Sequence, residues 1–115
     1  MSKKYIVVTG GAGFVGSNLI KRLIKNKKII ILSLDNYSSG KISNHIRSSR
    51  VKYIKGDIRN INKIFKKYQK YINTIFHFGE FSRIFQSFSK FNDCLESNLT
   101  GTQKVFSFCL NNRIR

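Results

Sequence analysis

Proline and tryptophan are absent from this 115-residue sequence, and acidic residues are few. The 5 aspartates and glutamates stand against 22 lysines and arginines, so the formal net charge is +17 at pH 7. A chain rich in Lys, Ile, Asn, Phe and Tyr without Pro or Trp matches the codon bias of an AT-rich genome. The apolar fraction of 41% is ordinary for a globular protein, and the sequence carries no repeat, heptad or low-complexity signature. The composition therefore predicts a single folded domain.

Cysteine is limited to Cys94 and Cys109, which are far apart and belong to no C-x-x-C or Cys/His cluster. This pattern argues against a zinc site and a disulfide scaffold, and we expect two reduced, partly buried thiols on helices. No apolar run approaches the length of a membrane span, and the residues after Met1 do not form the apolar core of a signal peptide. We therefore expect a cytoplasmic protein without a metal site or a membrane partner.

The positive charge admits two interpretations. A basic surface attracts nucleic-acid phosphates whatever their sequence. Here, however, the lysines occupy polar positions of amphipathic segments, such as residues 21–28 and 63–70, and are spread along the chain. We expect non-specific binding of polyanions at low salt and no specific nucleic-acid partner.

The stretch Thr9-Gly-Gly-Ala-Gly-Phe-Val-Gly16 connects an apolar strand pattern to a helical pattern. The strand is predicted at Tyr5–Val8, and apolar residues at helical spacing run from Phe14 to Ile24. A glycine turn between a strand and a helix is the context of a dinucleotide-binding site. The alternative is a glycine turn without a ligand.

Each glycine of this turn has a separate expected role. Gly10 lets the chain leave the strand in a tight turn, Gly13 lets a pyrophosphate approach the backbone, and Gly16 lets the helix pack closely on the sheet. The phosphates would meet free N–H groups at the positive end of the helix, which form an anion site without any charged side chain.

Alternating strand and helix patterns continue along the chain. The apolar runs predict strands at Ile29–Leu34, Val51–Lys55 and Thr74–Phe78. Helical spacing follows a capping Asn60, with Ile61, Ile64, Phe65 and Tyr68 on one face. A long helix is predicted from about Asp93 to Asn112, and its inward face is Leu95, Leu99, Thr102, Phe106, Cys109 and Leu110. This order predicts an α/β, Rossmann-type, doubly wound parallel sheet with strand order 3-2-1-4.

Polar residues follow the predicted strands. Asp35 ends the second strand, about twenty residues after the glycines, where an acid accepts hydrogen bonds from the adenosine ribose. Its carboxylate would repel a 2′-phosphate, so the sequence favours NAD over NADP. Asp57 follows the third strand and is placed to reach the adenine edge. His77 is interpreted as a sheet residue, and Gly79 allows close approach of a ligand.

Residues 36–50 are polar and predict a loop with a short helix. Tyr37 and Lys41 in this loop match a Tyr-x-x-x-Lys spacing, which on a helix puts a phenol and an ammonium on one face. The intervening residues Ser38, Ser39 and Gly40, directly after a strand, argue against a catalytic helix here.

Five motifs together resemble the N-terminal half of an extended short-chain dehydrogenase/reductase. The resemblance is to the NAD-dependent epimerase/dehydratase family, of which UDP-glucose 4-epimerase is a familiar member. The motifs are Thr9-Gly-Gly-Ala-Gly-Phe-Val-Gly16, Asp35-Asn36, Gly56-Asp57-Ile58, His77-Phe78-Gly79 and Asn98-Leu-Thr-Gly-Thr102. Their order and spacing cover residues 1–115 and make the resemblance more specific than any one motif.

The resemblance implies a set of NAD contacts. They are Gly10, Gly13, Phe14, Val15 and Gly16 at the pyrophosphate; Asp35, Asn36, Tyr37, Ser38, Ser39 and Gly40 at the adenosine ribose; Asp57 and Ile58 at the adenine; Phe78, Gly79, Glu80 and Ser82 toward the nicotinamide; and Asn98 behind the site. Glu80 replaces a small residue, and Ser82 followed by Arg83 replaces a common lysine, so the contacts near the nicotinamide depart from the family pattern.

The same resemblance places the catalytic residues elsewhere. Relatives use a Ser or Thr after a fifth strand and a later Tyr-x-x-x-Lys helix, and neither these nor a sugar-nucleotide domain lies within the 115 residues. We expect a cofactor-binding portion of a nucleotide-sugar epimerase or dehydratase that is inactive alone. It would act with a missing C-terminal half or as a homodimer. The alternative is an NAD-binding sensor or partner-docking module without catalysis.

Overall fold

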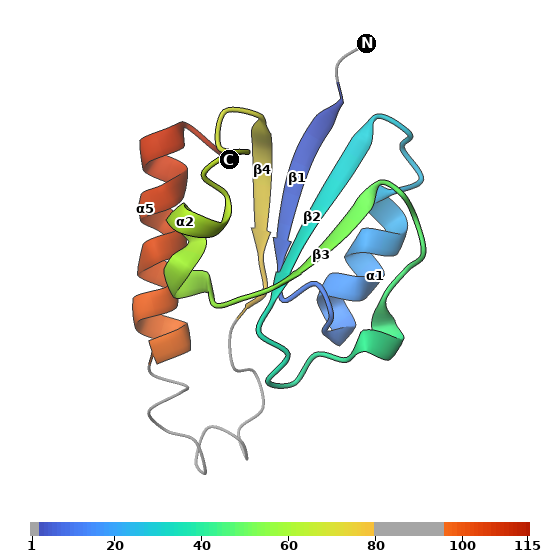
Figure 1. The fold of residues 1–115 in the computed structure, drawn as a ribbon, viewed down its shortest axis with the longest axis horizontal. Coiled ribbons are helices and arrows are strands. Elements are labelled where there is room, and N and C mark those ends of the chain that lie inside the picture. The colour runs from blue at the N-terminus through green and yellow to red at the C-terminus, as the bar shows by residue number, and fades with distance from the viewer. Residues whose placement is uncertain (1–2, 80–95) are drawn as a thin grey trace.

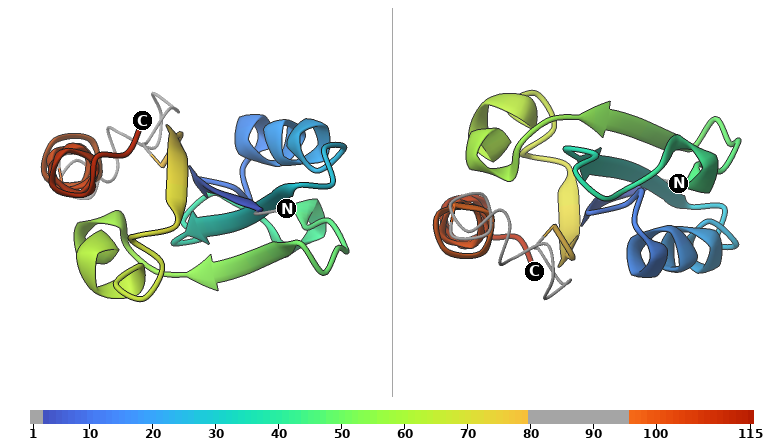
Figure 2. Two further views of the ribbon diagram at one scale, coloured as in Figure 1. Left: turned by 90° about the horizontal axis from the view of Figure 1, so that it is seen from above. Right: turned by 90° about the horizontal axis from the view of Figure 1, so that it is seen from below.

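A four-stranded parallel sheet in the order β3-β2-β1-β4 forms the centre of the fold. The structure is a computed structural model that describes residues 3–79 and 96–115. Its strands are β1 (Lys4–Thr9), β2 (Ile29–Asp35), β3 (Val51–Lys55) and β4 (Ile72–His77). Helix α1 covers one face, and α2 and α5 cover the other (Figures 1 and 2). The predicted doubly wound sheet and its strand order are therefore confirmed.

Two hydrophobic clusters explain why the central strands are apolar on both faces. In β1, Val7 joins the cluster under α2 and α5, whereas Ile6 and Val8 join the cluster that includes Ile20 of α1. Successive side chains of a strand point to opposite faces, so a strand covered on both sides reads as a continuous apolar run. This is why the strands could be located from the sequence.

The element bounds agree with most of the sequence predictions. The helices are α1 (Phe14–Leu23), η1 (Ile42–Asn44), η2 (Ile58–Asn60), α2 (Ile61–Ile64), η3 (Glu96–Gly101) and α5 (Thr102–Asn112). The predicted third strand is confirmed without change, and η1 is the short helix expected in the loop after β2. The fourth strand occupies Ile72–His77, not residues 74–78. Among the residues described, no helix is long and apolar enough to cross a membrane.

The capping prediction for Asn60 is wrong. Its side chain makes no capping hydrogen bond, and the preceding 3-10 turn η2 is capped by Asp57, whose carboxylate accepts a hydrogen bond from the Arg59 amide at 2.8 Å. The predicted apolar stripe is correct, because Ile61 and Phe65 are fully buried. The regular helix nevertheless ends after one turn, at Ile64.

The predicted inward face of the last helix is wrong in part. Leu99, Phe106 and Leu110 are 63%, 64% and 81% exposed, whereas Val105 and Phe108 are buried. The Phe108 ring lies 6.3 Å from the Phe65 ring, measured between centroids, so contact with the α2 segment sets which face turns inward. The π-helical turn η3 precedes α5 and shifts its phase from the regular 3.6-residue spacing.

Other parts of that prediction hold or fall outside the described structure. Cys109 is a free, half-buried thiol as expected, and burial raises its pKa. Thr102 is half-buried and bonds His77, so it lies on the inward side. The expected positions of Asp93, Cys94 and Leu95 lie outside the described residues.

The chain returns to β4 after α5. The helix ends at Asn112 because Arg113 adopts a left-handed backbone conformation with φ 54°. The Arg115 amide then donates to the Asn73 carbonyl at 3.3 Å, and the Ile75 amide donates to the Arg115 carbonyl at 2.6 Å. This is the hydrogen-bond pattern of a parallel strand pair, on the outer edge of β4.

Two phenylalanines on α5 test which face is buried. We expect Phe108→Ala to lower the free energy of unfolding by about 3–5 kcal/mol, because it leaves a cavity in the core. Phe106→Ala on the solvent side should change it by less than about 0.5 kcal/mol. Urea unfolding followed by circular dichroism measures both, and equal effects would contradict the orientation of α5.

Candidate functional site

The glycine turn lies at the carboxyl end of β1, at the topological switch point between β1 and β4. Gly10 has a φ of +71°, which favours glycine, and its amide donates to the Leu34 carbonyl at 2.7 Å. A Cβ at Gly10 would lie 2.5 Å from the Phe78 carbonyl oxygen. Both constraints confirm the predicted tight turn out of the strand, and the second places Phe78 directly beside it.

The other two glycines have different surroundings. A Cβ at Gly16 would collide with the Gly10 carbonyl oxygen, so the close packing predicted for Gly16 is between α1 and the turn itself. A Cβ at Gly13 would approach only the Gly10 carbonyl oxygen, at 3.3 Å, and would otherwise meet open space. The fold therefore requires a glycine at 16 but leaves room at 13.

Helix α1 starts at this open space. Gly13 is its N-cap residue and supplies no capping side chain, and the first turn contains no acidic residue. The side chains of Phe14 and Val15 are 82% and 56% exposed. The start of α1 thus presents uncapped backbone and two exposed apolar side chains, a surface suited to a phosphate with an organic substituent.

Asp35 connects the end of β2 to the glycine turn. One carboxylate oxygen accepts a hydrogen bond from the Ala12 amide at 3.0 Å, and the other accepts from the Tyr37 amide at 2.8 Å. Each carboxylate oxygen has a second lone pair, so Asp35 retains capacity for ribose hydroxyls. The ribose contact stays a prediction.

The loop after β2 is fastened to the same turn. The Ala12 carbonyl accepts hydrogen bonds from the Lys41 amide at 3.0 Å and from the Asn44 side chain at 2.7 Å. A Cβ at Gly40 would lie 2.7 Å from Asp35 and 3.0 Å from the Ala12 side chain. Sequence reasoning missed Asn44, since nothing in its local pattern indicates a partner 32 positions away.

The remaining loop residues lie farther out. Asn36, Ser38 and Ser39 are exposed, and the Ser38 amide donates to the Asn36 side chain at 2.9 Å in a local turn. Tyr37 has a φ of 61° and is not helical, so no helix displays the Tyr37–Lys41 pair.

A hydrogen-bonded chain joins the carboxyl ends of β1 and β4 to α5. The Thr9 hydroxyl accepts hydrogen bonds from the Phe78 and Gly79 amides, each at 3.0 Å. With both lone pairs in use it donates its proton to Nδ1 of His77, at 2.6 Å. The neutral ring then carries its proton on Nε2 and donates to the Thr102 hydroxyl at 3.0 Å. His77 is a sheet residue as predicted, whereas the roles of Thr9 and Thr102 were missed.

Asp57 and Ile58 are not bonded to the glycine turn by the hydrogen bonds described. The Asp57 carboxylate pairs with the Arg59 guanidinium at 2.6 Å, and Ile58 is buried in the cluster beneath α2 and α5. The Arg59 hydrogen bonds lower the pKa of Asp57 below its ordinary 3.8, against a smaller opposing effect of burial. Their adenine contacts stay predictions.

Three candidate positions are described incompletely or not at all. Glu80 and Ser82 lie outside the described residues. Asn98 lies within η3, but its side chain is not described.

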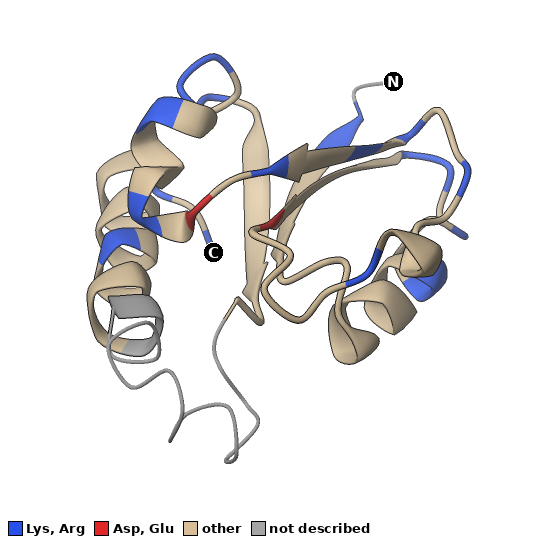
Figure 3. Ribbon diagram, turned by 60° about the horizontal axis from the view of Figure 1, so that its bottom comes forward, with Lys and Arg blue, Asp and Glu red and all other residues tan. Residues whose placement is uncertain are grey.

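Basic residues are spread over the turns, helices and strand ends of the described chain (Figure 3). Within the described ranges, no group of three or more His, Cys, Asp or Glu side chains is arranged to hold a metal ion. The charge distribution thus agrees with a general basic surface rather than one recognition element.

The chain of hydrogen bonds at Thr9 predicts a large effect of one atom. Thr9→Val keeps the shape but leaves the Gly79 amide and His77 without this partner, so we expect about 1–3 kcal/mol of destabilisation. Ser33 provides a control, because its buried hydroxyl has no hydrogen-bond partner among the described residues. Ser33→Ala should be nearly neutral or stabilising. Urea unfolding compares the two, and equal losses would contradict the network.

The Asp57–Arg59 pair predicts a pH dependence. Because the pKa of Asp57 is lowered by folding, its stabilisation is full above the unfolded value and is lost as pH falls through the folded value. Arg59→Gln should cost about 0.2–1 kcal/mol at pH 7, since the pair is partly exposed. Its difference from the parent protein should vanish below about pH 3. Unfolding at several pH values measures this, and a pH-independent difference would refute it.

Comparison with known proteins identifies relatives over nearly the whole chain. Residues 7–115 match the model of the 3-beta hydroxysteroid dehydrogenase/isomerase family. The chain is 31% identical to a dTDP-D-glucose 4,6-dehydratase of Dictyostelium discoideum, covering 96% of this chain and 27% of the relative.

Solved structures agree with this result. A UDP-glucose 4-epimerase of Thermotoga maritima, solved with UDP-glucose, superposes with a TM-score of 0.84 at 25% identity over 96% of this chain and 35% of that one. An enzyme of Bordetella bronchiseptica in complex with NAD+ gives a TM-score of 0.83 at 26% identity, covering 94% of this chain and 32% of that one.

The chain spans about a quarter to a third of the length of these relatives. The matched region nevertheless contains the entire described sheet and its glycine turn. The chain belongs to the 3-beta hydroxysteroid dehydrogenase/isomerase family, within the extended short-chain dehydrogenases/reductases that include the NAD-dependent epimerases and dehydratases.

Proposed function

We propose that the carboxyl edge of the sheet binds NAD. The observation that carries this proposal is the open position at Gly13, beside an uncapped helix start, within a turn that its neighbouring glycines hold tightly. A pyrophosphate needs such close access to backbone N–H groups. The cradle fits the cofactor that is bound in the related Bordetella enzyme.

Each part of the edge then has a role in holding the cofactor. The start of α1 binds the pyrophosphate, with Phe14 and Val15 packed against it. Asp35 accepts hydrogen bonds from the adenosine ribose, while its bonds to the Ala12 and Tyr37 amides keep the carboxylate oriented. Phe78, 40% exposed, and Gly79 border the nicotinamide side of the crevice.

We further propose that the chain is the cofactor-binding portion of a nucleotide-sugar epimerase or dehydratase. Bound NAD supplies a hydride acceptor for a sugar carbon that bears a hydroxyl. The residues of this chain position that acceptor and shield one side of it. The proton transfer at the sugar hydroxyl requires residues beyond those assigned here, so the chain by itself binds the cofactor without turnover.

A partner surface supports the second candidate, a docking module without catalysis. Leu99, Phe106 and Leu110 expose apolar side chains on one side of η3 and α5, and exposed apolar groups favour burial against another polypeptide. The partner is either a C-terminal half or a second copy. Neither role involves a specific nucleic acid or a membrane, and both suit the cytoplasm.

Substitution of Gly13 separates cofactor binding from folding. We expect Gly13→Ala to unfold at nearly the same temperature as the parent, because the added Cβ meets open space on all but one side. It should weaken NAD binding by about tenfold or more, because the Cβ occupies the approach of the pyrophosphate. Calorimetric titration with NAD measures the affinity, and thermal unfolding measures the fold.

Gly16→Ala is the matched control, since its Cβ collides with the Gly10 carbonyl and should destabilise the folded chain itself. NAD binding that survives Gly13→Ala unchanged would refute the proposed pyrophosphate site. Turnover of a UDP- or dTDP-sugar by the purified chain would refute the proposal that it binds without catalysis. Binding without turnover, in a stable dimer, would favour the docking module.

A further inference from the structure

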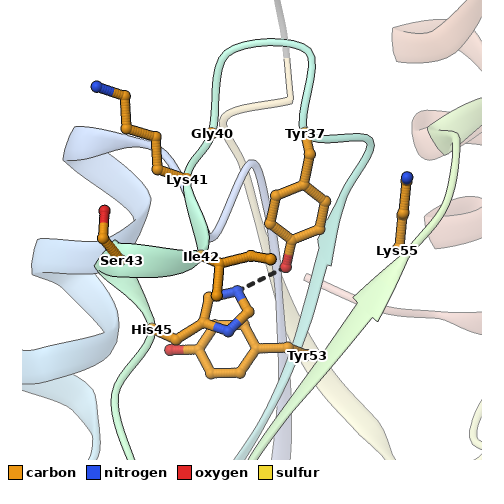
Figure 4. Close-up of a pocket in the computed structure, with 8 residues that line it drawn as sticks. All are labelled: Tyr37, Gly40, Lys41, Ile42, Ser43, His45, Tyr53 and Lys55. Carbon is orange, nitrogen blue, oxygen red and sulfur yellow. Dashed lines mark hydrogen bonds between the residues drawn. The ribbon is translucent and has the colours of Figure 1, made fainter.

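A second cavity lies beside the glycine turn, between the loop after β2 and strand β3. Its volume is about 600 Å³, which is within the range of small-molecule sites. Its polar lining comes from Tyr37, Lys41, Ser43, His45, Tyr53 and Lys55, which we call the loop pocket (Figure 4). None of the residues that line it is acidic.

Three aromatic rings form one wall of the loop pocket. The Tyr37 hydroxyl and Nε2 of His45 are 2.6 Å apart, and the His45 ring stacks on Tyr53 with centroids 3.7 Å apart and planes 9° apart. The Tyr53 hydroxyl accepts a hydrogen bond from the Ile46 amide at 2.8 Å. The rings are therefore fixed to one another and to the loop before any ligand arrives.

The loop pocket is positively charged. Lys41 and Lys55 stand on opposite sides of the three rings, and Ser43 adds a hydroxyl (Figure 4). Burial raises the pKa of the Tyr37 phenol, with smaller contributions from Asp35 and Tyr53, so the phenol stays neutral near pH 7. The lining thus offers two ammonium groups and neutral hydroxyls, a donor set suited to an anion with several oxygens.

Tyr37 is held in an unusual conformation that aims its ring toward His45. Its φ of 61° lies in the left-handed region, which few residues other than glycine adopt. The Asp35 carboxylate accepts a hydrogen bond from the Tyr37 amide and stabilises this conformation. The other Asp35 oxygen bonds the Ala12 amide of the glycine turn, so one carboxylate braces both the loop pocket and the proposed cofactor cradle.

We propose that the loop pocket binds a phosphate monoester. Lys41 and Lys55 neutralise the dianion, the Ser43 hydroxyl donates to a phosphate oxygen, and the organic part lies against the ring wall. Two sources have this chemistry. One is the 2′-phosphate of a dinucleotide, which rests on the proposed NAD site because Tyr37 and Gly40 border both. The other is a separate phosphorylated small molecule.

The test compares two variants of equal charge. Lys41→Gln/Lys55→Gln changes the loop pocket, and Lys63→Gln/Lys66→Gln removes two exposed charges elsewhere. Inorganic phosphate, NAD and NADP are titrated by calorimetry into the 115-residue chain at constant ionic strength. We expect the first variant to weaken phosphate binding about tenfold and the control to weaken it less than twofold.

The dinucleotides distinguish the two sources. Tighter binding of NADP than of NAD, with the preference lost in the Lys41→Gln/Lys55→Gln variant, supports a 2′-phosphate in spite of the Asp35 charge. Phosphate binding that is specific to the loop pocket, with no preference for NADP, supports a separate phosphorylated ligand.

Equal weakening of phosphate binding in both variants would overturn the proposal, because net charge alone would then explain it. The Gly13→Ala protein distinguishes this failure from failure of the NAD site. If that variant loses NAD but keeps phosphate binding in the loop pocket, the two sites stand separately. If the parent binds phosphate in the loop pocket but not NAD, only the proposed cofactor function fails.

Discussion

Close contact between the start of α1 and the end of β1 is the constraint on which this structure depends. Gly16 lies against the Gly10 carbonyl, and Gly10 in turn lies against the Phe78 carbonyl at the end of β4. A side chain at either glycine would force two backbone segments apart. The same contacts leave Gly13 facing open space, so tight packing on both sides of the turn creates the only part of it with room for a ligand.

Hydrogen bonds extend this constraint along the carboxyl edge of the sheet. Thr9 holds the amides after β4, and Asp35 holds Ala12 in the turn and Tyr37 in the following loop. His77 carries the connection to Thr102 on α5. The cofactor cradle and the loop pocket are thus two openings in one braced edge, and Asp35 is the residue that they share. A change at Asp35 alters the geometry of both, which makes it a poor choice for separating them and Gly13 a better one.

The sequence predicted the elements that are governed by local rules. Buried parallel strands require continuous apolar runs, and a strand that turns directly into a helix requires glycines at fixed positions, so β1 to β3 and the turn were found with few errors. The predictions failed where a distant partner decides. The face of α5 is set by Phe108 against Phe65, and the cap of η2 comes from Asp57 rather than Asn60.

By itself the sequence determined the fold class, the strand order and the place of the cofactor cradle, because side-chain periodicity and glycine geometry act between neighbours in the chain. Only the tertiary structure decided which side of α5 stays exposed, which hydroxyl joins β1 to β4, and that Tyr37, His45 and Tyr53 form one wall. Those contacts join residues from separate elements, and their distances follow from how the helices and loops pack on the sheet.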